Sequence, residues 1–190
     1  MSFDVLKCHL GRGRGRYKVQ KHCLRKKLRR RKWACAIIRG MSNPSQSCLD
    51  LIKRSEGLRL TPYLDAAGYW TVGYGHKLTN AELATGGQAR TITEPDALLL
   101  LINDVDWAAG QVTRLVHVPL SQGQLDALVD FTYNLGVERL AGSTLLKLLN
   151  LGNYADAGQQ LLRWDMAGGE HLAGLTVRRQ AELALWEGKQ

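Results

Sequence analysis

The stretch from Ser55 to Asn80, SEGLRLTPYLDAAGYWTVGYGHKLTN, constrains the fold most, because it carries strand signals between segments of helical character. Two runs of strand character, Leu58 to Leu64 and Tyr69 to Tyr74, lie on either side of the four residues Asp65-Ala66-Ala67-Gly68. A short Asp- and Gly-containing segment between two such runs is typical of a tight turn. The sequence therefore predicts a β-hairpin here.

Two acidic residues and a hydroxyl are distributed around this hairpin. Glu56 directly precedes the first strand, Asp65 ends it and Thr71 lies within the second strand, so the hairpin brings the three together. Cleavage of a glycosidic bond needs an acid for the leaving oxygen and a second carboxylate that activates water or attacks the sugar. On pattern alone, the alternative is that these are a helix-end charge, a turn former and an ordinary strand residue.

The segment EGLRLTPYLDAAGYWTVGYGH, residues 56–76, resembles the signature of the phage-type lysozymes, the endolysin muramidases of glycoside hydrolase family 24. In that family a Glu, an Asp nine residues later and a Thr six residues after that form the catalytic triad. Glu56, Asp65 and Thr71 match both spacings. The resemblance extends more loosely over residues 46–190 and does not cover residues 1–40. It implies an α+β, two-lobed, lysozyme-like fold, with a small β-hairpin lobe and a larger helical lobe joined by a long helix.

The resemblance also implies a function, which is hydrolysis of the β-1,4 bond between N-acetylmuramic acid and N-acetylglucosamine in bacterial peptidoglycan, causing lysis. Glu56 would be the general acid, Asp65 would stabilise positive charge at the anomeric carbon and help activate water, and Thr71 would position that water. Peptidoglycan is then the partner, no cofactor or metal is implied, and we expect a monomer. A lytic transglycosylase would act on the same bond with one catalytic Glu, and Asp65 and Thr71 at the family spacing argue against it.

Three further family segments imply supporting residues. The histidine of G-x-G-H pairs in the family with an acid on the long helix, which implies an ion pair between His76 and Asp104. FTYNLG resembles the family's F-x-x-N-x-G region, which implies that Tyr133 and Asn134 bind sugar hydroxyls and N-acetyl groups. GLTVRRQAE resembles G-L-x-x-R-R-x-x-E, which places Arg178 beside the catalytic acid. The alternatives are a histidine that packs or faces solvent and an asparagine that turns the chain at a helix end.

Capping residues and apolar periodicity predict the remaining elements. Ser45 or Ser47 can cap the first helix, Thr93 precedes the long helix with Pro95 in its first turn, and Ser121 with Gln124 forms a capping box. Residues 78–92 are expected to form a loop or an irregular third strand, and residues 165–174 a glycine-rich loop. The predicted helices span residues 46–56, 94–116, 122–135, 144–152, 154–164 and 174–186.

Charge is divided very unevenly along the chain. The net charge is +9, but residues 1–40 alone carry fourteen Lys or Arg and one acid, or +13, whereas residues 41–190 carry −4. We therefore predict a highly basic arm, residues 1–40, and a phage-type lysozyme domain, residues 41–190. A block of like charge usually stays disordered alone. Beside Trp33, such a block suits anionic surfaces, so the arm is expected to be disordered or membrane-active and to bind lipopolysaccharide or phospholipid.

Two alternatives for the arm remain open. Basic arms bind polyanions without selectivity, so nucleic-acid binding is possible, although no specific nucleic acid is implied. The other alternative is that Met41 is the natural start and residues 1–40 are an upstream extension or a fused peptide.

Apolar patterning and cysteine spacing bound the cellular context. No run of about 18 apolar residues is present, and the longest apolar run near the start, Trp33 to Ile38, is too short for a signal sequence. We therefore expect the protein to stay in the host cytoplasm until it is released to act on the cell wall. All four cysteines lie within the first 48 residues without a C-x-x-C pair, which favours unpaired thiols over a zinc site.

Overall fold

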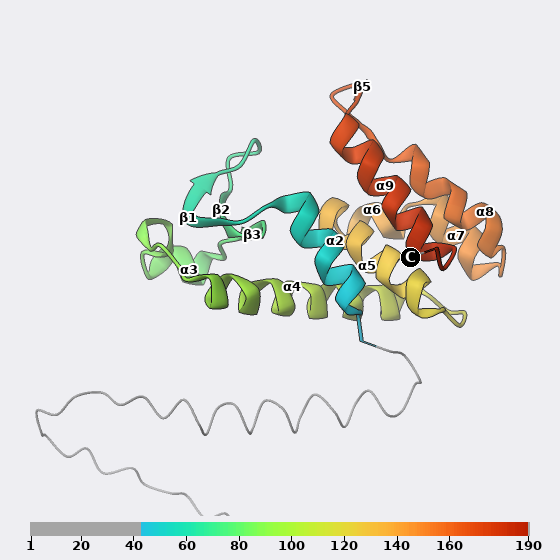
Figure 1. Cartoon of the computed structure of the whole chain (residues 1–190), viewed down its shortest axis with the longest axis horizontal. Helices are drawn as coiled ribbons and strands as arrows, with labels where there is room; N and C mark the ends of the chain where they lie inside the picture. Colours follow the sequence, from blue (N-terminus) through green and yellow to red (C-terminus); the bar gives the residue numbers. More distant parts are fainter. Residues whose placement is uncertain (1–42, 190) are drawn as a thin grey trace, which may run out of the picture. The chain divides into compact units, whose positions relative to one another are not determined.

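The computed structural model describes residues 43–189, and the predictions for residues 1–40 lie outside this range. A small antiparallel sheet lies on one side, a group of helices lies on the other, and the long helix α4 (Glu94–Leu115) extends beneath both (Figure 1). The sheet has the order β1-β2-β3. Its strands are β1 (Arg59–Leu64), β2 (Trp70–Gly73) and β3 (His76–Lys77). The predicted combination of a small hairpin lobe, a long helix and a larger helical lobe is confirmed.

The predicted hairpin forms where the sequence placed it. Its turn is closed by the Gly68 N–H, which donates to the Asp65 carbonyl over 2.9 Å. Gly68 adopts a φ of +82°, a left-handed conformation that glycine enters without steric cost. Thr71 is paired with Tyr63 on one side and with Lys77 on the other, so it lies on the central strand of the sheet.

Helix α4 (Glu94–Leu115) connects the two lobes. It begins as predicted, with a capping box between Thr93 and Asp96 and a proline in the first turn. Near its start it packs against β2 and β3, and further along it packs against helices α5 (Gln122–Leu135) and α6 (Val137–Ala141). A buried stripe runs along its whole length, formed by Ala97, Leu101, Val105, Ala108 and Val112. The stripe fixes the small lobe relative to the helical lobe.

The helical lobe is built around α5, which packs against helices α2 (Gln46–Glu56), α4, α6 and α9 (Ala173–Trp186). A capping box between Ser121 and Gln124 starts α5 as predicted. Because other helices surround it, α5 buries eight consecutive residues from Leu125 to Thr132, two of them aspartates. The remaining helices of this lobe are α7 (Thr144–Asn150), α8 (Tyr154–Gln159) and the 3₁₀ helix η2 (Gln160–Arg163).

Three predictions about local structure were wrong. Residues 78–92 contain a short helix, α3 (Asn80–Ala84), and a 3₁₀ helix, η1 (Gly87–Ala89). Helix α3 forms because Thr79 and Glu82 make a capping box at its start. Residues 165–174 contain a two-stranded hairpin, β4 (Met166–Ala167) and β5 (Glu170–His171), whose turn is made by two glycines with positive φ. The helix predicted over 154–164 is α-helical only to Gln159, after which it tightens into η2.

The start of the described chain is fixed to α5 by one buried carboxylate. Ser45 precedes α2 as predicted, but its hydroxyl does not cap the helix. Instead the Ser45 hydroxyl and N–H donate to the two oxygens of Asp126, over 2.6 and 2.9 Å. Gln122 donates through its amide to Asp126 and to the Asn43 carbonyl. We call this arrangement the Ser45 clamp.

Within residues 43–189 there is no helix whose length and apolar character suffice to cross a bilayer. Cys48 lies in the core with a free thiol, and burial raises the pKa of that thiol above its ordinary value.

Candidate active site

Glu56 is the last residue of α2, which ends because Gly57 leaves the helix with a φ of +69°. The Arg178 guanidinium donates through Nη1 to Glu56 Oε1 over 2.6 Å, and 24% of the glutamate side chain is exposed. The other oxygen, Oε2, lies against Gly75, where a Cβ atom would come within 3.2 Å of it. The predicted contact between Arg178 and Glu56 is therefore present, although they are 122 residues apart.

Arg178 is in turn held by Asp130, which the sequence analysis did not identify. Its Nε and Nη2 donate to the two carboxylate oxygens of Asp130, over 2.8 and 2.9 Å. Asp130 is fully buried and Arg178 is 5% exposed. Burial alone would lower the pKa of Arg178, but the carboxylates of Asp130 and Glu56 raise it above its ordinary value. The guanidinium thus stays charged, with one donor directed at Glu56.

Asp65 lies at the turn of the hairpin, where main-chain groups fix its carboxylate. Oδ1 accepts the N–H groups of Tyr69 and Ala67, over 2.8 and 2.9 Å, and the ammonium of Lys77 lies 3.3 Å from Oδ2. The pKa of Asp65 lies below its ordinary value, mainly because of the hydrogen bond from the Tyr69 N–H. Lys77 and the Ala67 N–H lower it further, and desolvation opposes them. Asp65 is therefore an ionised carboxylate. Lys77, which also lies over the Tyr69 ring, was not identified from sequence.

Thr71 and Asp65 both form hydrogen bonds with the main chain of Tyr69. Its hydroxyl donates to the Tyr69 carbonyl over 3.1 Å, while the Tyr69 N–H donates to Asp65. Thr71 is 3% exposed, because it lies on the central strand. The peptide groups of Tyr69 therefore hold the second carboxylate and the hydroxyl in one place.

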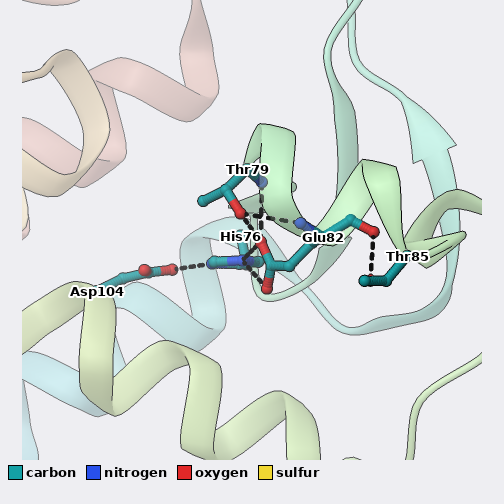
Figure 2. A network of polar contacts seen from close by, with 5 residues as sticks. All are labelled: His76, Thr79, Glu82, Thr85 and Asp104. Carbon is teal, nitrogen blue, oxygen red and sulfur yellow. Dashed lines mark hydrogen bonds and ion pairs between the residues drawn. The ribbon is translucent and has the colours of Figure 1, made fainter.

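His76 lies between two carboxylates (Figure 2). Its Nδ1 lies 2.7 Å from Asp104 Oδ2, so the predicted contact is present, and its Nε2 lies 3.3 Å from Glu82. The hydrogen bond to Asp104 raises the pKa of His76 above its ordinary value, with Glu82 adding to it and burial opposing it. Glu82 also accepts from the Thr79 N–H and hydroxyl, over 2.8 and 2.7 Å. The spacing Thr-x-x-Glu of Thr79 and Glu82 is a capping-box pattern, and it could have identified Glu82 from the sequence.

Tyr133 and Asn134, predicted to bind sugar, lie at the end of α5 and already have protein partners. The Tyr133 hydroxyl donates to the Tyr74 carbonyl over 2.6 Å, which links α5 to the segment before His76. Asn134 accepts from Arg179 Nη2 over 2.8 Å. Their contact with substrate stays a prediction.

The model of the phage lysozyme family matches residues 53–182 of this chain. The chain belongs to the phage lysozyme family. The chain is 41% identical to the endolysin of Acyrthosiphon pisum secondary endosymbiont phage 1 over 147 residues. The match covers 75% of this chain and 97% of that endolysin. The chain is also 39% identical to the endolysin of Bacillus phage B103 over 146 residues. This match covers 76% of this chain but only 54% of that endolysin.

Among solved structures, the muramidase domain of SpmX from Asticaccaulis excentricus has a similar fold. The TM-score is 0.68 at 34% identity, and the match covers 77% of this chain and 98% of that domain. The predicted lysozyme-like fold is thereby confirmed. Family membership makes the chain a glycoside hydrolase of the lysozyme class, with muramidase activity and peptidoglycan as its class of substrate.

The two carboxylates of this phage lysozyme have different surroundings. Asp65 is surrounded by N–H donors and an ammonium that keep it ionised. Glu56 has one oxygen oriented by Arg178 and the other directed along Gly75. A fixed anion and a separately oriented carboxyl group are the two components that glycoside hydrolysis requires.

Proposed function

We propose that the protein hydrolyses the β-1,4 bond between N-acetylmuramic acid and N-acetylglucosamine in peptidoglycan and so lyses bacterial cells. One observation carries the proposal, which is that Tyr69 holds both Asp65 and Thr71 through its main chain while Arg178 orients Glu56. In this proposal Glu56 is the acid, Asp65 is the permanent anion and Thr71 is the hydroxyl that binds water.

In the proposed reaction, Glu56 gives its proton to the leaving glycosidic oxygen. The Asp65 carboxylate stabilises the positive charge that develops at the anomeric carbon. Asp65 and Thr71 together orient a water molecule on the opposite face of the sugar. As the water oxygen bonds to the anomeric carbon it loses a proton to the Asp65 carboxylate, and the anomeric configuration is inverted. Tyr133 and Asn134 are proposed to contact the sugar, and the His76–Asp104 pair supports the loop that carries Gly75.

The test is digestion of purified peptidoglycan by the wild type and by Glu56→Gln, with the products read by mass spectrometry. Glu138→Gln is the matched control, because it makes the same change at an exposed glutamate of α6. We expect new reducing muramic acid ends from the wild type and from E138Q, and none from E56Q. A fully active E56Q would refute the role of Glu56, and anhydro products would indicate a lytic transglycosylase.

We further propose that residues 1–40 bring the enzyme to an anionic outer envelope. The support is the charge division, since residues 1–40 carry +13 whereas residues 41–190 carry −4 and gain nothing from an anionic surface. Deletion of residues 1–40 should preserve activity on isolated peptidoglycan and reduce killing of intact Gram-negative cells. A second form, with every Lys and Arg of residues 1–40 replaced by Gln, separates charge from length. Equal killing by all three forms would contradict the proposal, and killing by E56Q would favour a membrane-disrupting arm.

A further inference from the structure

Arg179 is a buried cation that the proposed reaction does not use. It follows Arg178 on α9, and its side chain is 0% exposed. The guanidinium is held from two sides. Glu182 Oε1 lies 2.9 Å from Nη2, and the centroid of the Phe131 ring lies 5.3 Å from the central carbon of the guanidinium. These contacts fix the direction in which Arg179 points.

The same nitrogen of Arg179 holds the side chain of Asn134. Nη2 donates to Asn134 Oδ1 over 2.8 Å. Across residues 43–189, Asn134 is the only hydrogen-bond acceptor of this guanidinium. An arginine side chain has donors and no acceptor. The atom of Asn134 that faces Arg179 is therefore the carbonyl oxygen, and the amide nitrogen points away from the arginine.

The amide nitrogen of Asn134 is left available to a ligand. Within the part of the chain that the structure describes, it donates to no group, and it is not among the buried atoms that lack a partner. The side chain is half-buried, so its N–H groups are open to solvent. Because its oxygen is occupied, Asn134 offers a ligand donors only, whereas an amide that could rotate would offer both a donor and an acceptor.

Asn134 lies beside the groups that orient the proposed acid. It follows Asp130 by one turn of α5, so the two side chains share a face of that helix. Successive arginines of α9 hold them, since Arg178 donates to Asp130 and Arg179 donates to Asn134. Arg178 also donates to Glu56. Neighbouring side chains of one helix therefore orient the amide of Asn134 and the carboxyl group of Glu56.

We propose that Arg179 is a positioning residue for the substrate, which holds the Asn134 amide by its oxygen and so presents the N–H groups to a carbonyl oxygen of the bound glycan. Glu182 takes part indirectly, because it fixes the guanidinium. The inference rests on the proposed function, since it takes a glycan as the ligand. It deepens that function by giving Asn134 one hydrogen-bonding role, that of a donor.

The first test is Asn134→Asp. Aspartate has nearly the same shape and can still accept from Arg179, but its second oxygen replaces the amide nitrogen and donates nothing. We expect the Tm to stay within about 3 °C of the wild type. KM on peptidoglycan should rise at least about tenfold with kcat little changed, because a binding contact is lost. An unchanged KM would overturn the proposal.

Two further variants separate this role from a merely structural one. Asn134→Ala should also raise KM, but it should lower the Tm as well, because the buried Arg179 loses its acceptor. Asn43→Asp is the matched control, since it makes the same change at an exposed residue ahead of α2 and should leave KM and Tm unchanged. A lower Tm for N134A with an unchanged KM in both variants at Asn134 would show a structural role only and refute the inference.

The part played by Arg179 is tested by the double variant R179M/E182Q. It removes the buried ion pair as a whole, so that neither charge is stranded. KM should rise roughly two- to tenfold, because the Asn134 amide is no longer immobilised. In an N134A background the same double change should raise KM no further, since Arg179 acts through Asn134. Effects on KM that multiply would contradict this. Glu182→Gln alone keeps Arg179 and should keep the KM of the wild type.

A binding measurement covers the case in which R179M/E182Q does not fold. The side-chain amide protons of Asn134 in the wild type can be followed by NMR while the trimer of N-acetylglucosamine is added. We expect these signals to shift on binding, and unchanged signals at saturating trimer would overturn the proposal. A wild type that binds the trimer through Asn134 but cleaves no peptidoglycan would refute the proposed function alone.

Discussion

Replacement of Arg178 by methionine is the most direct test of the buried ion pair behind Glu56. The unbranched methionine keeps most of the packing of the arginine stem, so the change removes mainly charge and hydrogen bonds. It leaves the Asp130 carboxylate fully buried without its cation. Breaking a buried pair in this way costs about 3–5 kcal/mol. Two charge-assisted hydrogen bonds at about 1.5–3 kcal/mol each give a similar sum.

The contact of Arg178 with Glu56 contributes less to stability, because 24% of the glutamate side chain is exposed and solvent screens the pair. We assign it less than about 1 kcal/mol. The expected loss for R178M is therefore about 4 kcal/mol, most of it due to Asp130. A domain of this size is stabilised by about 5–15 kcal/mol, so the loss is large but leaves a folded population to measure.

Urea unfolding at pH 7, followed by tryptophan fluorescence, measures this loss as a lower midpoint at an unchanged m-value. Arg163→Met is the matched control, because Arg163 is exposed and hydrogen-bonds only Gln160 among the described contacts; we expect a change below about 0.5 kcal/mol. The double variant R178M/D130N removes the stranded charge and should recover at least half of the loss. A loss below about 1 kcal/mol for R178M, the range of exposed ion pairs, would refute this reasoning.

Two further predictions concern the small lobe. Because the folded pKa of His76 is raised, the stabilisation that His76 contributes is complete below about pH 6.5 and is lost as pH rises through the folded pKa. The Tm difference between the wild type and His76→Gln should therefore be largest in acid and shrink in alkali. A Tm difference that does not change with pH would contradict this prediction. Gly75→Ala should lower both stability and kcat, because Gly75 has a φ of +89° and the new Cβ would press on Glu56 Oε2. The backbone strain costs about 1–2 kcal/mol. Thermal unfolding measures the loss of stability and turnover measures kcat, and an unchanged kcat would exclude this contact as a constraint on Glu56.

The sequence predicted those elements whose signals are local. Thr93 and Ser121 start α4 and α5 through capping boxes that can be recognised over four residues. The hairpin follows equally from its turn residues and from the two runs of strand character on either side of them. The contacts of Arg178 and His76 came from resemblance to a family rather than from spacing. Short elements such as α3 were missed, although Thr79 and Glu82 carry the same kind of cap.

The acidic partners within the helical lobe could not be found in this way. An aspartate or glutamate within a helical pattern is normally expected on the solvated face. Asp130 and Glu182 are buried because α5 is covered on all sides and α9 packs directly on it. That information lies in the packing of helices about 50 residues apart, and a single sequence does not show which of its charged residues meet there.

The Ser45 clamp has a mechanical consequence for anything attached ahead of the domain. Tension on the chain before Asn43 would be taken up first by Asp126 and Gln122 of α5, which hold Ser45 and Asn43. Glu56 lies at the opposite end of α2, roughly 15 Å away along an eleven-residue helix. A tether that binds a surface can therefore pull on the enzyme at its anchored end, while the hairpin that carries Asp65 and Thr71 remains free of the load.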